Sequence, residues 1–194
     1  MLGRSIKKFM ERYEFYILQM EVIGMREAGV VYWFTGLSGA GKTTIGKFFY
    51  DYLRNQKDNV VFLDNDELKD VLWTEDIGYS REQRKKRSFV GGRLAKLLSE
   101  QGMDVICCAI SMFDDVRKWN RDNIYNYKEI YLDVPMEILV SRNSKGLYNK
   151  LKKDIVGLDI IAEFPKTPDI VIYNDGSDTI ENIVRKIINE FHIG

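Results

Sequence analysis

The chain has 194 residues, of which 45% are hydrophobic and 30% are charged, and its formal net charge at pH 7 is zero. This length and composition predict one soluble globular domain with a large core. Since no net charge attracts nucleic acid or an anionic membrane, and no run reaches the roughly 20 apolar residues of a membrane span, we expect neither kind of partner.

Residues 1–29 precede the first predicted strand and are interpreted as an N-terminal helical extension. Six apolar residues in this stretch repeat at helical spacing: Ile6, Phe9, Met10, Tyr13, Ile17 and Met20. We expect this amphipathic helix to pack on the domain or on a second subunit, which makes a homodimer the expected assembly. Acidic residues, Glu11 among them, interrupt any signal-peptide core, so we expect a cytoplasmic protein.

Apolar runs alternate with helical patterns along residues 30–194. The predicted strands are Val30–Thr35, Val60–Leu63, Asp104–Ile110, Glu129–Val134 and Asp169–Tyr173. One predicted helix begins near Lys42, and four others cover Arg81–Glu100, Asp114–Asn123, Pro135–Arg142 and Asp178–Phe191. In the last of these, Asp178 and Glu181 are near capping-box spacing. The alternation predicts an α/β fold with a five-stranded, mostly parallel sheet flanked by helices, and ligands at the carboxyl ends of the strands.

The rare residue types exclude other chemistry. Cys107 and Cys108 are adjacent in an apolar run, where they form neither a disulfide framework nor a metal motif. His192 is the only histidine and lies close to the C-terminus. We therefore expect no catalysis that depends on a histidine.

A complete phosphate-binding loop follows the first predicted strand. It reads Gly36, Leu37, Ser38, Gly39, Ala40, Gly41, Lys42 and Thr43, and Thr44 continues it into the helix. The glycines let backbone N–H groups surround the phosphates of a nucleotide. Lys42 is expected to bridge the β- and γ-phosphates while pointing at phosphate and solvent, and the Thr43 hydroxyl to ligate Mg²⁺.

The other motifs narrow the class of nucleotide-binding protein. The N-K-x-D element of guanine-specific GTPases does not occur, and the chain is small for a ring or motor ATPase. A compact kinase for a nucleotide or metabolite remains, with ATP and Mg²⁺ as cofactors. A nucleotide-binding regulatory module without turnover is the alternative from another class.

The chain resembles the adenylylsulfate kinase family in six ordered blocks. Residues 33–44 resemble its P-loop, 63–69 its L-D-G-D-N-V-R and 78–84 its G-F-S-x-E-D-R. Ala95–Leu97 with Ile110–Ser111 resemble A-K-L with I-S-P, and Asp133–Pro135 with Lys145–Tyr148 resemble D-V-P with K-G-L-Y. Gly157, Asp159, Glu163 and Pro165 are in register with its F-T-G-I-D-x-P-Y-E-x-P segment. The resemblance implies phosphorylation of the 3′-hydroxyl of adenylyl sulfate, a reaction of sulfate assimilation.

The resemblance also implies roles for individual residues. Asp66 would hold Mg²⁺ or act as the base, Arg142 would belong to the ATP site, and Lys145 would be catalytic in a lid spanning residues 144–165. The implied acceptor site comprises Asp64, Lys69, Tyr79, Arg84, Arg87, Ile110, Ser111, Lys145, Gly146, Leu147 and Ile155. For Lys85 and Lys86, in the same basic run, a solvated helix face is the preferred interpretation.

Departures from the family pattern concentrate on the acceptor side. Lys69 replaces an arginine, Arg87 replaces an asparagine, and Ile155 replaces the phenylalanine that stacks on the acceptor base in the family. Tyr79 keeps the other aromatic face. The expected acceptor is adenylyl sulfate, and cytidine diphosphoramidate, which some family members phosphorylate in capsule synthesis, is the close alternative.

Overall fold

The computed structural model describes residues 27–73, 78, 80–142, 156–157 and 159–194. The predicted extension, apart from its last three residues, and residues 144–155 of the predicted lid therefore lie outside the described residues. Within the described ranges, no helix is long and apolar enough to cross a membrane.

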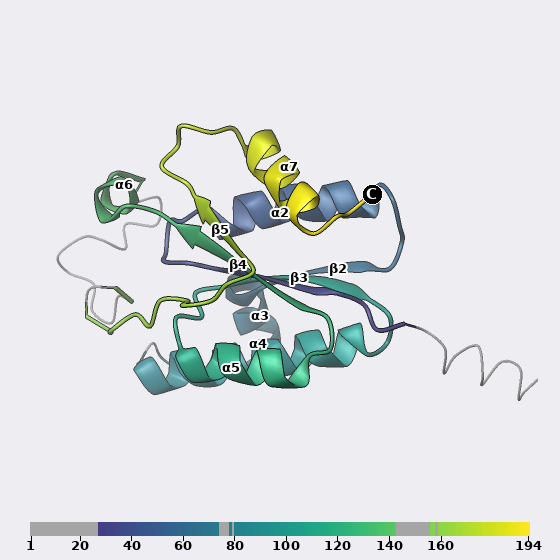
Figure 1. Cartoon of the computed structure of the whole chain (residues 1–194). Coiled ribbons are helices and arrows are strands. Elements are labelled where there is room, and N and C mark those ends of the chain that lie inside the picture. The colour runs from purple at the N-terminus through teal and green to yellow at the C-terminus, as the bar shows by residue number, and fades with distance from the viewer. Residues whose placement is uncertain (1–26, 74–77, 79, 143–155, 158) are drawn as a thin grey trace, which may run out of the picture.

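Five parallel strands form the sheet, in the order β2-β3-β1-β4-β5 (Figure 1). They are β1 (Val31–Thr35), β2 (Val60–Asp64), β3 (Asp104–Ala109), β4 (Tyr127–Asp133) and β5 (Ile170–Tyr173). Each lies within about two residues of the strand predicted for it. The predicted α/β class and the five-stranded sheet are confirmed, and every pairing is parallel rather than most of them.

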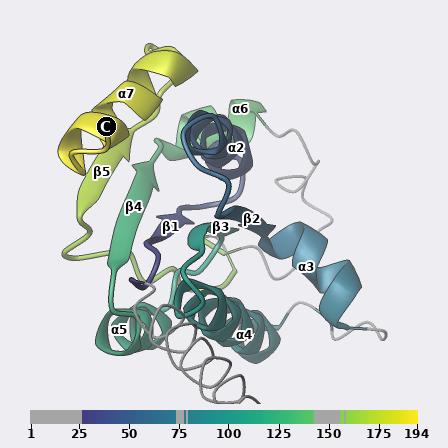
Figure 2. The same ribbon diagram turned by 90° about the vertical axis from the view of Figure 1, so that its right-hand side faces the viewer.

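Helices cover both faces of the sheet (Figures 1 and 2). On one face lie α2 (Lys42–Arg54) and α7 (Ile180–Glu190), and on the other lie α3 (Asn65–Leu72), α4 (Arg81–Ser99) and α5 (Asp114–Asn123). The short α6 (Met136–Arg142) follows β4. Since neighbouring residues of a strand point to opposite faces, the sheet supplies two separate cores.

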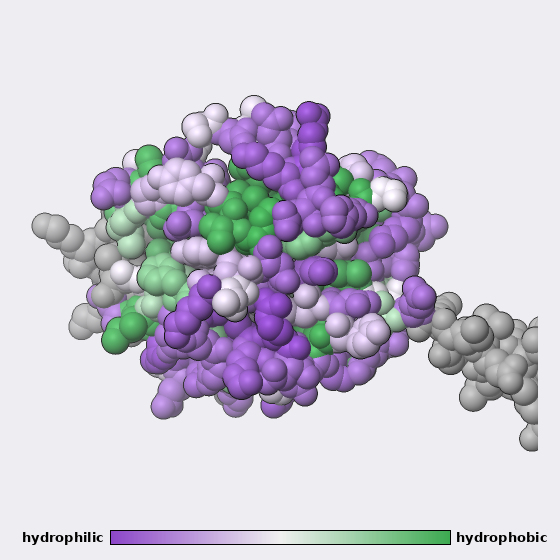
Figure 3. Space-filling model, viewed as in Figure 1, coloured by the Kyte–Doolittle hydropathy of each residue, from purple (hydrophilic) through white to green (hydrophobic). Residues whose placement is uncertain are grey.

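The two cores divide the strand residues by parity. Tyr32, Phe34 and Cys108 pack with the α2 and α7 side chains, whereas Trp33 and Cys107 pack toward α4. The adjacent cysteines therefore point to opposite faces, and both are free thiols. Figure 3 shows a largely hydrophilic surface in which smaller hydrophobic areas are set.

Two local details differ from the sequence expectations. Helix α3 was not predicted: Asp64 ends β2 and its carboxylate caps α3 by accepting a hydrogen bond from the Asp66 backbone N–H. At α7, Thr179 is the N-cap and accepts from Asn182 N, so the predicted pair of Asp178 and Glu181 does not cap that helix. Asp178 instead pairs with Lys186.

Candidate active site

The P-loop connects β1 to α2 at the carboxyl edge of the sheet. Gly41 occupies the N-cap position of α2 with φ 92°, in the left-handed region that favours glycine. A Cβ atom added there would also lie 2.9 Å from Asn174 Nδ2. Among the residues that the structure describes, no side chain caps α2. The partial positive charge of this helix terminus thus faces the site, where it favours an anion.

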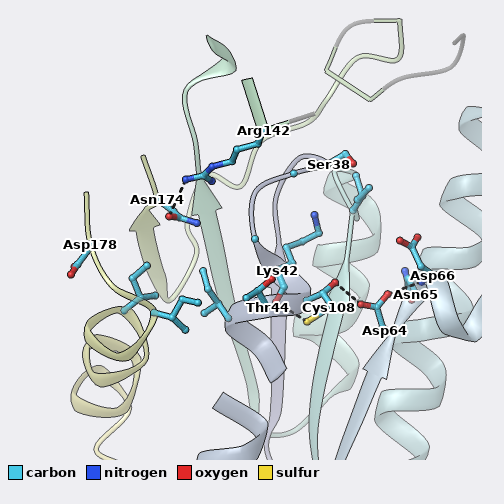
Figure 4. A pocket seen from close by; sticks show the side chains of 17 residues that line it. Ser38, Lys42, Thr44, Asp64, Asn65, Asp66, Cys108, Arg142, Asn174 and Asp178 are labelled. Atoms are coloured by element: carbon cyan, nitrogen blue, oxygen red, sulfur yellow. Dashed lines mark hydrogen bonds between the residues drawn. The ribbon is translucent and has the colours of Figure 1, made fainter. Parts of the chain in front are cut away.

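A cavity of about 500 Å³ opens beside this loop (Figure 4). Ten of the predicted site residues line it: Ser38, Gly39, Gly41, Lys42, Thr43, Thr44, Asp64, Asp66, Ile110 and Arg142. They come from the segments that follow β1, β2 and β3 and from α6, and parallel strands bring those ends to one edge. The topology therefore assembles residues that are distant in sequence.

The Lys42 side chain is buried rather than directed at solvent. Only 8% of the residue is exposed, and its ammonium donates a hydrogen bond of 2.7 Å to the Leu37 carbonyl. Lys42 is therefore less exposed than expected, because its ammonium turns back onto the loop, while the side chain still lines the cavity. Bridging of two phosphates by Lys42 stays a prediction.

Asp64 is the carboxylate that contacts the P-loop helix. The Thr43 hydroxyl donates a hydrogen bond of 2.6 Å to Asp64 Oδ2, while Asp64 Oδ1 accepts from Asp66 N at 2.8 Å. Asp64 is 6% exposed, whereas Asp66 is exposed in the first turn of α3 (Figure 4). The sequence assigned the metal to Thr43 and Asp66, and the geometry adds Asp64 as the carboxylate beside Thr43.

These groups fit a magnesium ion bound together with a nucleotide. No group of three or more His, Cys, Asp or Glu side chains gathers in the described part of the chain. Mg²⁺ keeps several waters and needs only one or two protein oxygens besides phosphate oxygens. A buried carboxylate hydrogen-bonded to a P-loop hydroxyl supplies that donor set.

The far end of the cavity is built by residues that the sequence interpretation missed. Asn174 follows β5, donates from Nδ2 to the Ala40 carbonyl at 2.9 Å, and accepts from Arg142 at 3.5 Å. Asp178, Ile180 and Ile183, at the start of α7, complete the wall. The available signal was the position of Asn174 at the carboxyl end of the fifth predicted strand.

Cys108 forms part of the floor. Its thiol donates to the Lys42 carbonyl at 3.3 Å, and burial, with the nearby Asp64 charge, raises the pKa of the thiol. The sulfur is therefore protonated at neutral pH and acts as a packing group and donor. It is not a nucleophile.

The predicted acceptor residues are only partly gathered. Ile110 lines the cavity, whereas Lys69, Arg84 and Arg87 lie half-buried on α3 and α4, outside its lining. Of the two lysines interpreted as solvated, Lys86 is exposed and Lys85 pairs with Asp115. Five further residues lie outside the described ones: Tyr79, Lys145, Gly146, Leu147 and Ile155.

Ser111 is enclosed, contrary to its predicted place in the acceptor site. The residue is 0% exposed, and within the described ranges its hydroxyl has no hydrogen-bond partner. Its carbonyl accepts from Thr35 Oγ1 at 3.4 Å and from Arg117 at 3.0 Å. The Ser111 backbone thus joins the end of β3 to Thr35 on β1 and to Arg117 on α5.

Sequence comparison agrees with this architecture. The family model described as adenylylsulphate kinase matches residues 28–173, which is most of the chain. The chain belongs to the adenylylsulphate kinase family. It is therefore a kinase-type phosphotransferase that acts on nucleotides.

Individual family members differ in the acceptor that they are named for. The chain is 39% identical over 170 residues to a cytidine diphosphoramidate kinase of Campylobacter jejuni, covering 86% of this chain and 98% of that one. It is 36% identical to an adenylyl-sulfate kinase of Rippkaea orientalis, covering 84% and 91% of the two chains. The family therefore includes proteins named for different nucleotide acceptors.

A solved structure supports the same fold. The APS kinase CysC of Mycobacterium tuberculosis, in complex with AMPPNP and APS, superposes with a TM-score of 0.77 at 28% identity. The alignment covers 85% of this chain and 98% of that one. This adenylylsulphate kinase fold therefore accommodates an ATP analogue and a nucleotide acceptor together in that relative.

Proposed function

We propose that this protein transfers the γ-phosphoryl group of ATP to a hydroxyl group of a nucleotide acceptor. The observation that carries the proposal is the P-loop cavity, in which Lys42, Thr43 and Asp64 converge where three strands end. The acceptor hydroxyl oxygen bonds to the γ-phosphorus as the bond to the β-phosphate bridge breaks. ADP leaves, and the hydroxyl proton goes to a carboxylate or to water.

The cavity has a distinct place for each part of ATP. The phosphates belong at the P-loop and the N-terminus of α2. The adenine belongs between the Arg142 guanidinium and the apolar wall of Ile180 and Ile183, where the guanidinium plane offers a stacking partner. Arg142 is held toward that wall through Asn174, which is itself anchored to the P-loop carbonyl of Ala40.

The chemistry on the acceptor side depends on two carboxylates. Asp64 and Thr43 would hold Mg²⁺, which when bound neutralises phosphate charge during transfer. Asp66, exposed two residues beyond the end of β2, lines the cavity, where it would orient the acceptor hydroxyl. Most of the rate then comes from positioning and charge neutralisation.

For the acceptor we favour cytidine diphosphoramidate over adenylyl sulfate. The higher identity to the cytidine diphosphoramidate kinase supports this choice. The substitutions Ile155 and Arg87, which change the base-stacking and anion-binding positions of the family pattern, support it as well. Adenylyl sulfate, which the family resemblance alone favoured, is the second candidate, because the ATP side matches both.

An acceptor screen tests the proposal. Purified protein, ATP and Mg²⁺ are mixed with each acceptor, and ADP formation and the phosphorylated product are measured. We expect acceptor-dependent ADP formation, with the larger kcat/KM for cytidine diphosphoramidate. A larger kcat/KM for adenylyl sulfate would reverse the order of the candidates. ATP binding without any acceptor-dependent turnover would favour the regulatory module.

A further inference from the structure

Residues 156–157 and 159–163 contact the P-loop at one end and the starts of helices α4 and α5 at the other. Val156 and Ile160 are buried in the same core as the P-loop residue Leu37. Gly157 has φ 93°, and a Cβ atom added there would lie 3.0 Å from Leu37 Cδ2. This stretch, which we name the P-loop strap, thus packs closely against the loop at its first residues.

Glu163, at the other end of the P-loop strap, contacts two helices. Its carboxylate accepts a hydrogen bond of 2.6 Å from the Asp114 backbone N–H, at the start of α5. The same carboxylate forms an ion pair with Arg81, the first residue of α4. The Glu163 backbone N–H also donates to the Met112 carbonyl at 3.0 Å.

Each contact stabilises the N-terminus of the partner helix. The N-cap residue of α5, Phe113, caps nothing with its own side chain, so within the described ranges the Glu163 carboxylate supplies the cap from a distant segment. A cation at a helix N-terminus is unfavourable, and Glu163 offsets the Arg81 charge there. Arg81 also donates to the Ile161 carbonyl at 3.0 Å, which binds α4 to the strap a second time.

A buried arginine reinforces the same junction. Arg117 is 5% exposed and donates to the Glu163 carbonyl at 2.6 Å and to the Ser111 carbonyl at 3.0 Å. Its Nε lies 3.3 Å from the buried carboxylate of Glu129 on β4. The backbone of Glu163 is therefore fixed to the segment after β3, both directly and through Arg117, which leaves its side chain as a defined support for α4.

We propose that Glu163 is a positioning residue that sets the first turn of α4, and with it Arg84, relative to the P-loop. Arg84 follows Arg81 by three residues, on the same side of the helix, and its backbone N–H bonds to the Ser80 carbonyl at 3.0 Å. Glu163 itself contacts no substrate. The inference deepens the proposed function and rests on it, since Arg84 is the predicted contact for the acceptor's anionic groups.

An ordinary surface ion pair contributes little to stability. Removing the Glu163 charge should therefore have a larger effect than removing a charge from an exposed pair. Glu163→Gln removes the charge and keeps the side-chain shape, and Arg81→Gln removes the partner. The matched control is Asp122→Asn, which breaks the exposed Lys118–Asp122 pair on α5. For Glu163→Gln we expect the acceptor KM to rise about tenfold, the scale of one lost charge-assisted hydrogen bond, with the ATP KM within about twofold of wild type.

The double variant distinguishes positioning from general destabilisation. Glu163→Gln with Arg81→Gln should raise the acceptor KM by less than the product of the two single effects, because the two changes share the loss of one ion pair. Glu163→Asp, which keeps the charge on a shorter side chain, should recover part of the loss. Equal rises in the KM values of ATP and acceptor, or additive effects of the two changes, would overturn the proposal.

A second readout does not depend on catalysis. Glu163→Gln should speed amide hydrogen exchange at Arg84 and Asp114 while leaving the β1 amides unchanged, and Asp122→Asn should do neither. If wild-type protein turned over no acceptor, the proposed function would fail while this exchange pattern still reported on Glu163. Unchanged hydrogen exchange at the Arg84 and Asp114 amides would by itself contradict the positioning role of Glu163.

Discussion

The ammonium group of Lys42 is the single charge on which the P-loop site depends most. Lys42→Ala should lower turnover by at least about 10²-fold, because the electrostatic stabilisation of the transferring phosphoryl group is lost. The Leu37 carbonyl also loses its partner, so the free energy of unfolding should fall by about 1 kcal/mol. ADP formation and urea denaturation measure the two effects. Lys47→Ala on the same helix is the control, and full activity of Lys42→Ala would contradict the assignment.

The two carboxylates at the end of β2 can be separated by isosteric changes. Asparagine is as good an N-cap as aspartate, so Asp64→Asn should keep α3 and remove only the charge beside Thr43. We expect kcat to fall about 10²-fold and the Mg²⁺ requirement to rise, with little change in melting temperature. Asp66→Asn should lower kcat without changing the Mg²⁺ requirement. If Mg²⁺ titrations showed a raised requirement for Asp66→Asn and not for Asp64→Asn, the metal ligand would be Asp66 rather than Asp64.

At the scale of the element, helix α4 depends on a capping box. The Ser80 hydroxyl accepts from Gln83 N while the Gln83 side chain accepts from Ser80 N at 3.0 Å. Ser80→Ala should cost about 1 kcal/mol of unfolding free energy, as should Thr179→Ala at the N-cap of α7. Only Ser80→Ala should also raise the acceptor KM, because α4 carries Arg84. If Ser80→Ala and Thr179→Ala had equal acceptor KM values, the α4 cap would have no effect on the acceptor site.

Helix α3 was not predicted, although residues at its start were identified as candidate site residues. Asp64 and Asp66 were assigned to the acceptor and metal sites, and the spacing of Asp64 before an acidic first turn is also that of an N-cap. The helix buries no residue completely, so it lacks the apolar stripe by which α2 was recognised. Its start depends on the cap and on contacts with α4 and β2.

At the scale of the whole molecule, ATP should stabilise the fold. A ligand that binds only the native state at 100 times its Kd adds about 2.7 kcal/mol to the unfolding free energy. We expect the melting temperature of the wild type to rise with ATP and Mg²⁺, and that of Lys42→Ala to rise much less. Thermal denaturation across an ATP series measures this. Equal stabilisation of both proteins would show that Lys42 does not bind ATP.

The predicted homodimer is a second property of the whole molecule. Phe164, Val171 and Tyr173, on or beside the edge strand β5, expose about half of their surface. Light scattering during gel filtration should give about twice the chain mass of 22.7 kDa. A monomer at micromolar concentration would make the dimer prediction wrong.

The sequence by itself determined the sheet, its parallel direction and the P-loop. These follow from local information: short apolar runs alternate with helical stripes, and the loop from Gly36 to Thr43 is contiguous, so its backbone geometry is encoded where it acts. Such features need no knowledge of which strand lies beside which.

Only the tertiary structure decided which polar groups meet. Asp64 rather than Asp66 faces Thr43 because β2 ends beside the start of α2, and Asn174 reaches Ala40 across 134 residues of sequence. Ser111 is enclosed although its neighbour Ile110 lines the cavity, and Glu163 caps α5 from 49 residues further along the chain. Long-range pairs of this kind depend on the order of the strands and on which side chains are buried. The spacing of neighbouring residues in the sequence determines neither.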